Sequence, residues 1–397
     1  YNALDALSSG TFSNTAVGSF AGTAITSGQN NIAIGVSSLA SCTSGGSNVA
    51  IGDEALNATT TSSNNTAVGK AALTANTTGT SNVAVGAQSL DANTTASHNT
   101  AVGHASLGVT TTGHSNTSVG QGAAENVTTG SHNVAVGRNS LGSQTTANNN
   151  VAIGQSALFA NTTGTSNTAV GAYALDAATT ADNNTAVGHD ALTANTTGTR
   201  NTAVGVSALD SVTTGSNNVA VGHYAGADYT SGGQSIFIGR ETGGTGGSGI
   251  TAIGFFACSN TTADNTMGIG YNALSANTTG GDNVAVGNNA LDANTTGSSN
   301  TALGRSTLGA NTTGENNTAV GSNTLDACTT GARNVAVGSF AMTNSTTAEE
   351  CVAIGQGALE NLTTGSQNTA LGQNALKANS TADNNTAVGR NAMVANT

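Results

Sequence analysis

The chain has 397 residues, yet it contains no proline and no tryptophan, and aromatic residues make up only 3% of it. A compact globular core in a chain of this length would need more large side chains, so the composition argues against ordinary globular domains. The sequence also has no apolar run of 18 residues, the length that a membrane-spanning helix requires. We therefore expect no membrane insertion.

Charge is equally sparse, with 8 basic and 20 acidic residues and a formal net charge of −12. So few cations argue against nucleic-acid binding, which depends on lysine and arginine contacts to phosphates. The acidic residues are scattered over several positions, and the G-G-x-G-x-D repeat of calcium-binding rolls is absent. We expect no metal along the chain and no cofactor.

Cysteine and histidine give little sign of a reactive site. The four cysteines are Cys42, Cys258, Cys328 and Cys351; their spacing fits no zinc site, and we interpret them as free thiols. His98, His114 and His132 recur at similar places and are interpreted as solvent-exposed, the alternative being a transition-metal site on an oligomer axis. No nucleophile–base arrangement, carboxylate pair or phosphate loop stands out, so the sequence predicts a protein that is not an enzyme.

The abundant feature is a short repeat, typified by Asn184-Thr185-Ala186-Val187-Gly188. Its closing glycine occurs 23 times between Gly18 and Gly389; 20 of the 22 intervals are 17 residues long, and the other two are 15 and 16. The consensus reads N-[TV]-A-[VI]-G-x-x-A-L-x-A-N-T-T-G-x-x. A fixed short period is the signature of a solenoid.

Seventeen residues are too few for a helix pair but suffice for two strands of about 4–5 residues and two turns, which form one rung of a parallel β-solenoid. The sequence therefore predicts an all-β left-handed β-roll of about 23 rungs. Stacked rungs place each repeat position above its own copy, so identical side chains form ladders. We expect Asn184 to belong to an amide ladder at a tight turn and Gly188 to adopt positive φ.

Because side chains alternate along a strand, we expect Val187 and Leu192 to face each other in a thin core. Ala186 then faces away from that core, and alanine holds this place in 20 of 23 copies. A strand that is apolar on both faces is buried on both faces. From the alanine column we predict packing against other copies of the chain, as a homotrimer.

The pattern is disturbed between Gly222 and Gly270, where the two short intervals fall. We divide the chain into regular repeats at 1–221, an irregular glycine- and aromatic-rich stretch at 222–270, and regular repeats at 271–397. The simplest interpretation of the irregular stretch is a locally repacked or kinked part of the array. The alternative is a binding site, formed by Tyr224, Tyr229, Phe237, Arg240, Phe255 and Phe256.

The repeat N-T-A-V-G-x-x-A-L-x-A-N-T-T-G resembles the repetitive shafts of phage and virus tail-fibre proteins. It is similar, more distantly, to the head repeats of trimeric autotransporter adhesins (YadA-like), whose S-V-A-I-G core is matched at Val151-Ala152-Ile153-Gly154. The resemblance covers essentially the whole chain, although the 17-residue unit is longer than that of the adhesins. It implies a trimeric left-handed β-roll in an extracellular fibre, on a virion or a cell surface.

The resulting functional expectation is a structural, non-catalytic shaft that presents a receptor-binding tip. Its partner is a host or cell-surface receptor, contacted through the tip or the irregular stretch. One rival is an adhesin whose shaft itself binds glycans. Another is an ice-binding solenoid, disfavoured because the recurrent Thr-Thr pair falls in a turn rather than on a strand.

Overall fold

The computed structural model describes residues 3–4 and 13–395. The extreme ends of the two regular stretches, residues 1–2, 5–12 and 396–397, lie outside the described residues. The chain divides into two compact units, residues 1–201 and 202–397. In each unit the described residues form a parallel β-solenoid, as the 17-residue period predicted, and none of them is helical. Across residues 3–4 and 13–395, nothing has the helical length and apolarity that a membrane crossing requires.

Every described rung contributes one strand of three residues, which ends just before the repeat glycine. The strands of the first unit are β1 (Thr15–Val17), β2 (Ile32–Ile34), β3 (Val49–Ile51), β4 (Thr66–Val68), β5 (Val83–Val85), β6 (Thr100–Val102), β7 (Thr117–Val119), β8 (Val134–Val136), β9 (Val151–Ile153), β10 (Thr168–Val170) and β11 (Thr185–Val187). Those of the second unit are β12 (Thr202–Val204), β13 (Val219–Val221), β14 (Ile236–Ile238), β15 (Thr251–Ile253), β16 (Met267–Ile269), β17 (Val284–Val286), β18 (Thr301–Leu303), β19 (Thr318–Val320), β20 (Val335–Val337), β21 (Val352–Ile354), β22 (Thr369–Leu371) and β23 (Thr386–Val388).

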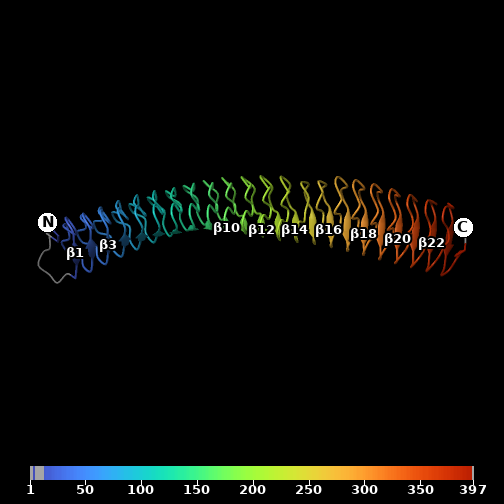
Figure 1. The fold of residues 1–397 in the computed structure, drawn as a ribbon, viewed down its shortest axis with the longest axis horizontal. Coiled ribbons are helices and arrows are strands. Elements are labelled where there is room, and N and C mark those ends of the chain that lie inside the picture. The colour runs from blue at the N-terminus through green and yellow to red at the C-terminus, as the bar shows by residue number, and fades with distance from the viewer. Residues whose placement is uncertain (1–2, 5–12, 396–397) are drawn as a thin grey trace. The chain divides into compact units, whose positions relative to one another are not determined.

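Within each unit, consecutive strands lie side by side in chain order and pair in parallel (Figure 1). The register is that of the repeat: Ala169 of β10 lies opposite Ala186 of β11, and Val170 lies opposite Val187. A one-residue slip would exchange the two faces of the strand, so the repeat fixes the register.

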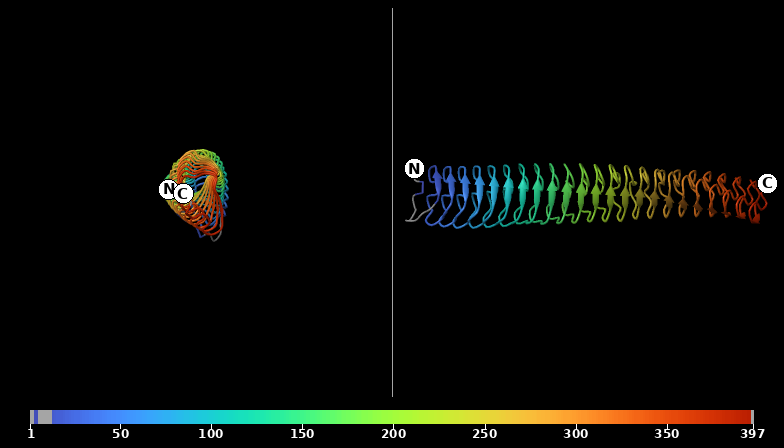
Figure 2. Two further views of the ribbon diagram at one scale, coloured as in Figure 1. Left: turned by 90° about the vertical axis from the view of Figure 1, so that its right-hand side faces the viewer. Right: turned by 90° about the horizontal axis from the view of Figure 1, so that it is seen from below.

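In the rungs that the structure describes, the second strand that we predicted is absent; a coil takes its place and runs back along the other side of the roll (Figure 2). The reason is a local backbone conformation that no strand tolerates. Asp190 and Leu192, two and four residues after Gly188, have φ of 56° and 55°, and these places have positive φ in rung after rung. Such left-handed residues break the extended geometry that a ladder requires.

The core lies between the strands and this coil; our prediction was right for Leu192 but wrong for the strand residue that faces it. Ala186, the middle residue of β11, is fully buried against the coil side, as is Leu192, whereas Val187 points outward and is 36% exposed. The two faces of the strand are thus the reverse of what we expected. The space between strand and coil is thin, and a leucine from the coil fills it only where the strand presents a small side chain.

The repeat glycine has the role expected of it. Gly188 has φ of 143°, and a Cβ on Gly171, its counterpart one rung earlier, would lie 2.3 Å from the Gly188 carbonyl oxygen. Both the left-handed backbone and the close approach of the next rung therefore require glycine.

The amide ladder is confirmed at Asn184, which is 1% exposed. Its Nδ2 donates to Asn167 Oδ1 at 3.2 Å and to the Gly198 carbonyl at 2.9 Å. Its own Oδ1 accepts the backbone N–H of Asn201 at 2.9 Å. Each asparagine of the column thus joins three rungs and satisfies buried backbone groups.

A second amide ladder, at the asparagine of the N-T-T-G turn, is discontinuous. Asn294 donates to Asn277 at 2.8 Å and Asn311 donates to Asn294 at 2.9 Å, but the next rung has Cys328 at this place. Asn311 Oδ1 is then buried without a partner, and so is Ser345 Oγ one rung beyond Cys328. Asn93, Asn161 and Asn195 have the same unpaired oxygen, each where the next rung lacks asparagine.

We expect Cys328→Asn to stabilise the second unit. The new amide would donate to Asn311 Oδ1 and accept from Ser345 Oγ, and one unsatisfied buried group costs about 1–3 kcal/mol. Urea denaturation should show a gain of about that size. Cys328→Ala is the control, because it removes the thiol without supplying a donor; equal stability of the two variants would contradict the role of the unpaired atoms.

The four cysteines are free and buried. Burial raises the pKa of the Cys258 thiol to about 12 and that of Cys328 to about 11, and it also raises the pKa of Cys42 and Cys351. The Cys258 and Cys328 thiols therefore remain protonated in the folded chain well above the pH at which they ionise in the unfolded chain.

Alkaline pH is expected to destabilise the chain through these thiols. An acid whose folded pKa is raised contributes stability below its unfolded pKa of 9.0, and this contribution is lost as the pH rises toward about 12 at Cys258. Denaturation curves between pH 8 and 11 should show the decline, and Cys258→Ala should reduce it. Rapid reaction of the folded chain with a thiol reagent at pH 8 would contradict this picture.

Candidate functional site

Two surfaces of the chain are candidates for a function, and the first is the outer strand face. We define it as the first and third residues of every strand, β1 to β23. The third residue is valine, isoleucine or leucine in every strand, and the first is threonine, valine, isoleucine or methionine. Ile153 and Leu303 are 39% and 45% exposed, and no strand contains a charged residue. Each unit therefore has a regular, uncharged and largely apolar face.

The second surface lies in the irregular stretch, around β13 to β16, and it originates in the core. Phe237 replaces the usual inward alanine of β14 and is fully buried. Its ring occupies the space that two coil leucines would otherwise fill: a Cβ on Gly226 would lie 2.7 Å from the ring, and one on Gly243 would lie 2.3 Å from it. The phenylalanine ring therefore fills the core volume that the two glycines leave empty.

Tyr229 belongs to the same core cluster. It is fully buried, and its ring packs edge-on against Phe237 with centroids 4.9 Å apart. Its hydroxyl donates to the Gly247 carbonyl at 2.6 Å and lies 3.1 Å from Ser235 Oγ. Burial raises the pKa of this hydroxyl. Tyr229 and Phe237, two of the six residues predicted to bind a ligand, are thus interior residues that a ligand does not reach.

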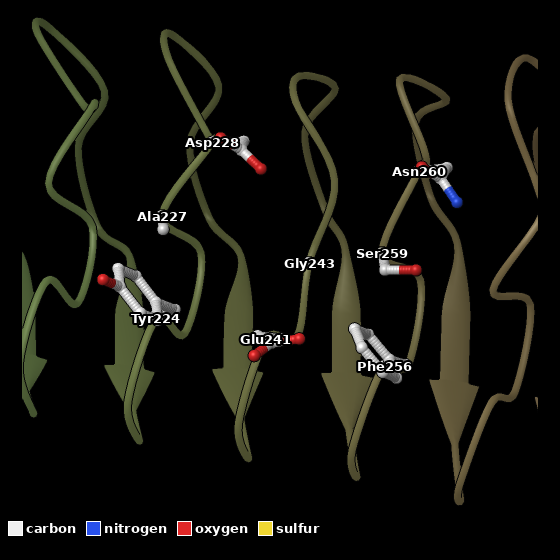
Figure 3. Close-up of a pocket in the computed structure, with 8 residues that line it drawn as sticks. All are labelled: Tyr224, Ala227, Asp228, Glu241, Gly243, Phe256, Ser259 and Asn260. Atoms are coloured by element: carbon white, nitrogen blue, oxygen red, sulfur yellow. The ribbon is translucent and has the colours of Figure 1, made fainter.

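A cavity of about 460 Å³ opens on the coil side of these rungs. The rung after β14 is shortened, and its Gly243 forms the floor of the cavity. The rungs before and after this one supply the walls (Figure 3). The lining residues are Tyr224, Ala227, Asp228, Glu241, Gly243, Phe256, Ser259 and Asn260. Ligand pockets in proteins commonly have a volume of this order.

The cavity combines aromatic walls with oxygen atoms. Glu241 lies between the rings of Tyr224 and Phe256, and Asp228 and Asn260 project at the opposite end (Figure 3). Glu241 Oε1 accepts two hydrogen bonds from the Arg240 guanidinium, at 2.7 and 2.9 Å. The Asn260 amide donates to the Ser275 carbonyl at 2.6 Å, and Ser259 Oγ donates to the same carbonyl at 3.2 Å.

Aromatic residues continue from the cavity along the same edge of the roll. Phe255 contacts Phe256, with centroids 4.2 Å apart, and stacks on Tyr271 at 5.7 Å with an interplanar angle of 17°. The Arg240 guanidinium lies over the Phe255 ring at 5.5 Å, within the range of a cation–π interaction. Tyr224 is accompanied by His223, with ring centroids 4.2 Å apart.

Four of the six predicted binding residues, Tyr224, Arg240, Phe255 and Phe256, thus lie together on the surface. Sequence reasoning missed Asp228, Glu241, Asn260 and Tyr271. One signal was available, because Tyr271 occupies the same repeat position as Phe255, directly after the glycine. The acidic and amide residues gave no such signal.

Residues that suggested a metal are only partly brought together. His114 and His132 are in edge-on contact, with ring centroids 5.0 Å apart. Within residues 3–4 and 13–395, no three histidine, cysteine, aspartate or glutamate side chains converge in a metal-binding arrangement.

Comparison with known proteins adds no family assignment: no protein-family model matches the chain, and neither does any curated protein.

Proposed function

We propose that this chain is a non-catalytic shaft of an extracellular fibre, in which copies of the chain assemble in parallel as a homotrimer through their outer strand faces. The observation that supports assembly is the outer strand face itself. Valine, isoleucine and leucine side chains there are commonly 36–45% exposed, as at Val187 and Leu303. Exposed apolar surface of this extent marks interaction sites in soluble proteins.

The size of the face is adequate for a stable interface. Each strand presents two outward side chains, and each side chain exposes roughly 50 Å². The 11 strands of the first unit and the 12 strands of the second therefore expose on the order of 1,000 Å² in each unit. A standard interface buries about 800 Å² per partner. Burial of such a surface is favourable at about 25 cal/mol per Å², before the costs of association are subtracted.

Another copy of the same chain is the occupant that fits this face. Its side chains recur once per rung with a strict period, so a partner needs the same period to match it at every rung. A second copy of the chain has the same period because it has the same sequence. The parallel trimer, the location on a virion or cell surface and the receptor-binding tip are what the tail-fibre and adhesin resemblance implies.

Light scattering on the folded chain tests the assembly. We expect three times the chain mass of 38.2 kDa, and electron microscopy should show uniform fibres. A monomeric mass would refute the proposal. A monomer that also lowers the freezing point of its solution would favour the ice-binding alternative, since threonine is the commonest first residue of the strands.

A further inference from the structure

We propose that the cavity lined by Tyr224, Asp228, Glu241, Phe256 and Asn260 binds a neutral saccharide. The inference is independent of trimer assembly, because the cavity lies on the coil side and the outer strand face lies on the other side of the core. An assembled fibre would therefore leave it open to solvent.

The cavity has a fixed floor. Gly243 is buried, and the Phe237 ring directly beneath it blocks any side chain at this place. Phe237 is in turn held by the Tyr229 ring, whose hydroxyl is anchored to the Gly247 carbonyl. The two sets of walls come from the rungs on either side of Gly243, and both are tied into the backbone hydrogen bonding of the roll. The site is thus largely formed before a ligand arrives, which reduces the entropic cost of binding.

Hydrogen bonding in the cavity favours a ligand that supplies donors. Asp228 and Glu241 present carboxylate oxygens, which only accept hydrogen bonds when ionised. Ser259 Oγ and one N–H of Asn260 are directed to the Ser275 carbonyl, so the two side-chain oxygens remain as acceptors for a ligand beside the second N–H of Asn260. Hydroxyl groups are the donors that a sugar carries in number.

The aromatic walls favour the same ligand. One face of a pyranose ring exposes several C–H groups, and such a face packs on an aromatic ring while the hydroxyls at its edge remain free for hydrogen bonds. Tyr224 is 42% exposed, and Phe256 stands across the cavity from it. The row that continues through Phe255 to Tyr271, itself 47% exposed, offers further stacking positions for an oligosaccharide.

Charge selects the class of sugar. Glu241 is neutralised by Arg240 in an ion pair of 2.7 Å, and Asp228 contributes a further negative charge. Uronic acids and sulfated sugars would be repelled by the Asp228 carboxylate, because Arg240 compensates the charge of Glu241. A neutral sugar has no charge that the site would repel, so we assign the site to neutral hexose oligosaccharides.

The test is a titration of the full chain with pentasaccharides of glucose, mannose and galactose, followed by calorimetry and saturation-transfer NMR. A glucosamine pentamer and a galacturonate pentamer supply positive and negative probes. We expect at least one neutral probe to bind and the galacturonate probe not to bind. Failure of every neutral probe, or tighter binding of the glucosamine probe, would overturn the assignment.

Three variants locate the binding. Phe256→Ala should weaken it about tenfold, a factor that corresponds to ~1.4 kcal/mol. Ser259→Phe should abolish it by filling the cavity; Phe159 has the same repeat position, and its ring already covers Gly142 of the rung before. Tyr173→Ala is the matched control, because Tyr173 has the repeat position of Tyr224 but lies in the first unit. Unchanged affinity in the first two variants, with unchanged circular dichroism, would place the binding elsewhere and refute the site.

Discussion

Replacement of Val170 and Val187 by aspartate is expected to convert the assembled chain into folded monomers. Both side chains belong to the outer strand face of the first unit, in neighbouring strands that pair in register. An unpaired carboxylate removed from water costs several kcal/mol, and a symmetric assembly would repeat this cost in every copy. The fold itself should survive because neither side chain lies in the core. Light scattering should therefore report a mass of 38.2 kDa, with the circular dichroism of the parent chain.

The matched control adds the same two charges elsewhere on the same rungs. Thr180 and Thr197 lie on the exposed turn, and Thr180→Asp with Thr197→Asp should leave the assembled mass unchanged. Assembly that persists in the valine variant would move the interface away from the outer strand face. Assembly lost in both pairs would point to net charge rather than to a specific surface.

The period of the sequence was sufficient to predict the parallel solenoid, its register and the roles of Gly188 and Asn184, because stacked rungs impose the same demand at each copy. The orientation of the strand was not predictable in this way. Alternation defines two faces, and in N-T-A-V-G both are apolar, so the pattern does not say which face lies inside. The size of the side chain decides which face lies inside, because Ala186 leaves room in the core for Leu192, whereas an inward-pointing Val187 would not.

The irregular stretch illustrates the same limit. Its bulky residues stand out from the repeat, but Phe237 and Tyr229 fill the core whereas Tyr224 and Phe256 line a cavity. Only the residues that each side chain contacts distinguish the two buried rings from the two rings in the cavity. Phe237 occurs with glycine in place of leucine at both neighbouring coil positions, Gly226 and Gly243, and this compensation was present in the sequence. Asp228 and Glu241 could not be found because isolated acidic residues are scattered throughout the chain.

The packing around Phe237 predicts a large effect of a substitution in the core. Ala186→Phe should strongly destabilise the first unit, since its ring would occupy the space of Leu175 and Leu192, which are both fully buried. Overpacking of a core typically costs about 1–3 kcal/mol and sometimes more. Urea denaturation should show a loss at or above that range, and hydrogen exchange should show that β10 and β11 open first.

The compensation seen around Phe237 should be transferable to this rung. Leu175 and Leu192 correspond to Gly226 and Gly243, so Leu175→Gly with Leu192→Gly should restore most of the stability of Ala186→Phe. The same two glycines without the phenylalanine should be destabilising, because each removed leucine leaves a cavity that costs about 2–5 kcal/mol. The triple variant should therefore be more stable than either parent, a coupling that a double-mutant cycle measures directly. If the effects simply add, the thin core is not what orients Ala186 inward, and the outward position of Val187 would need another cause.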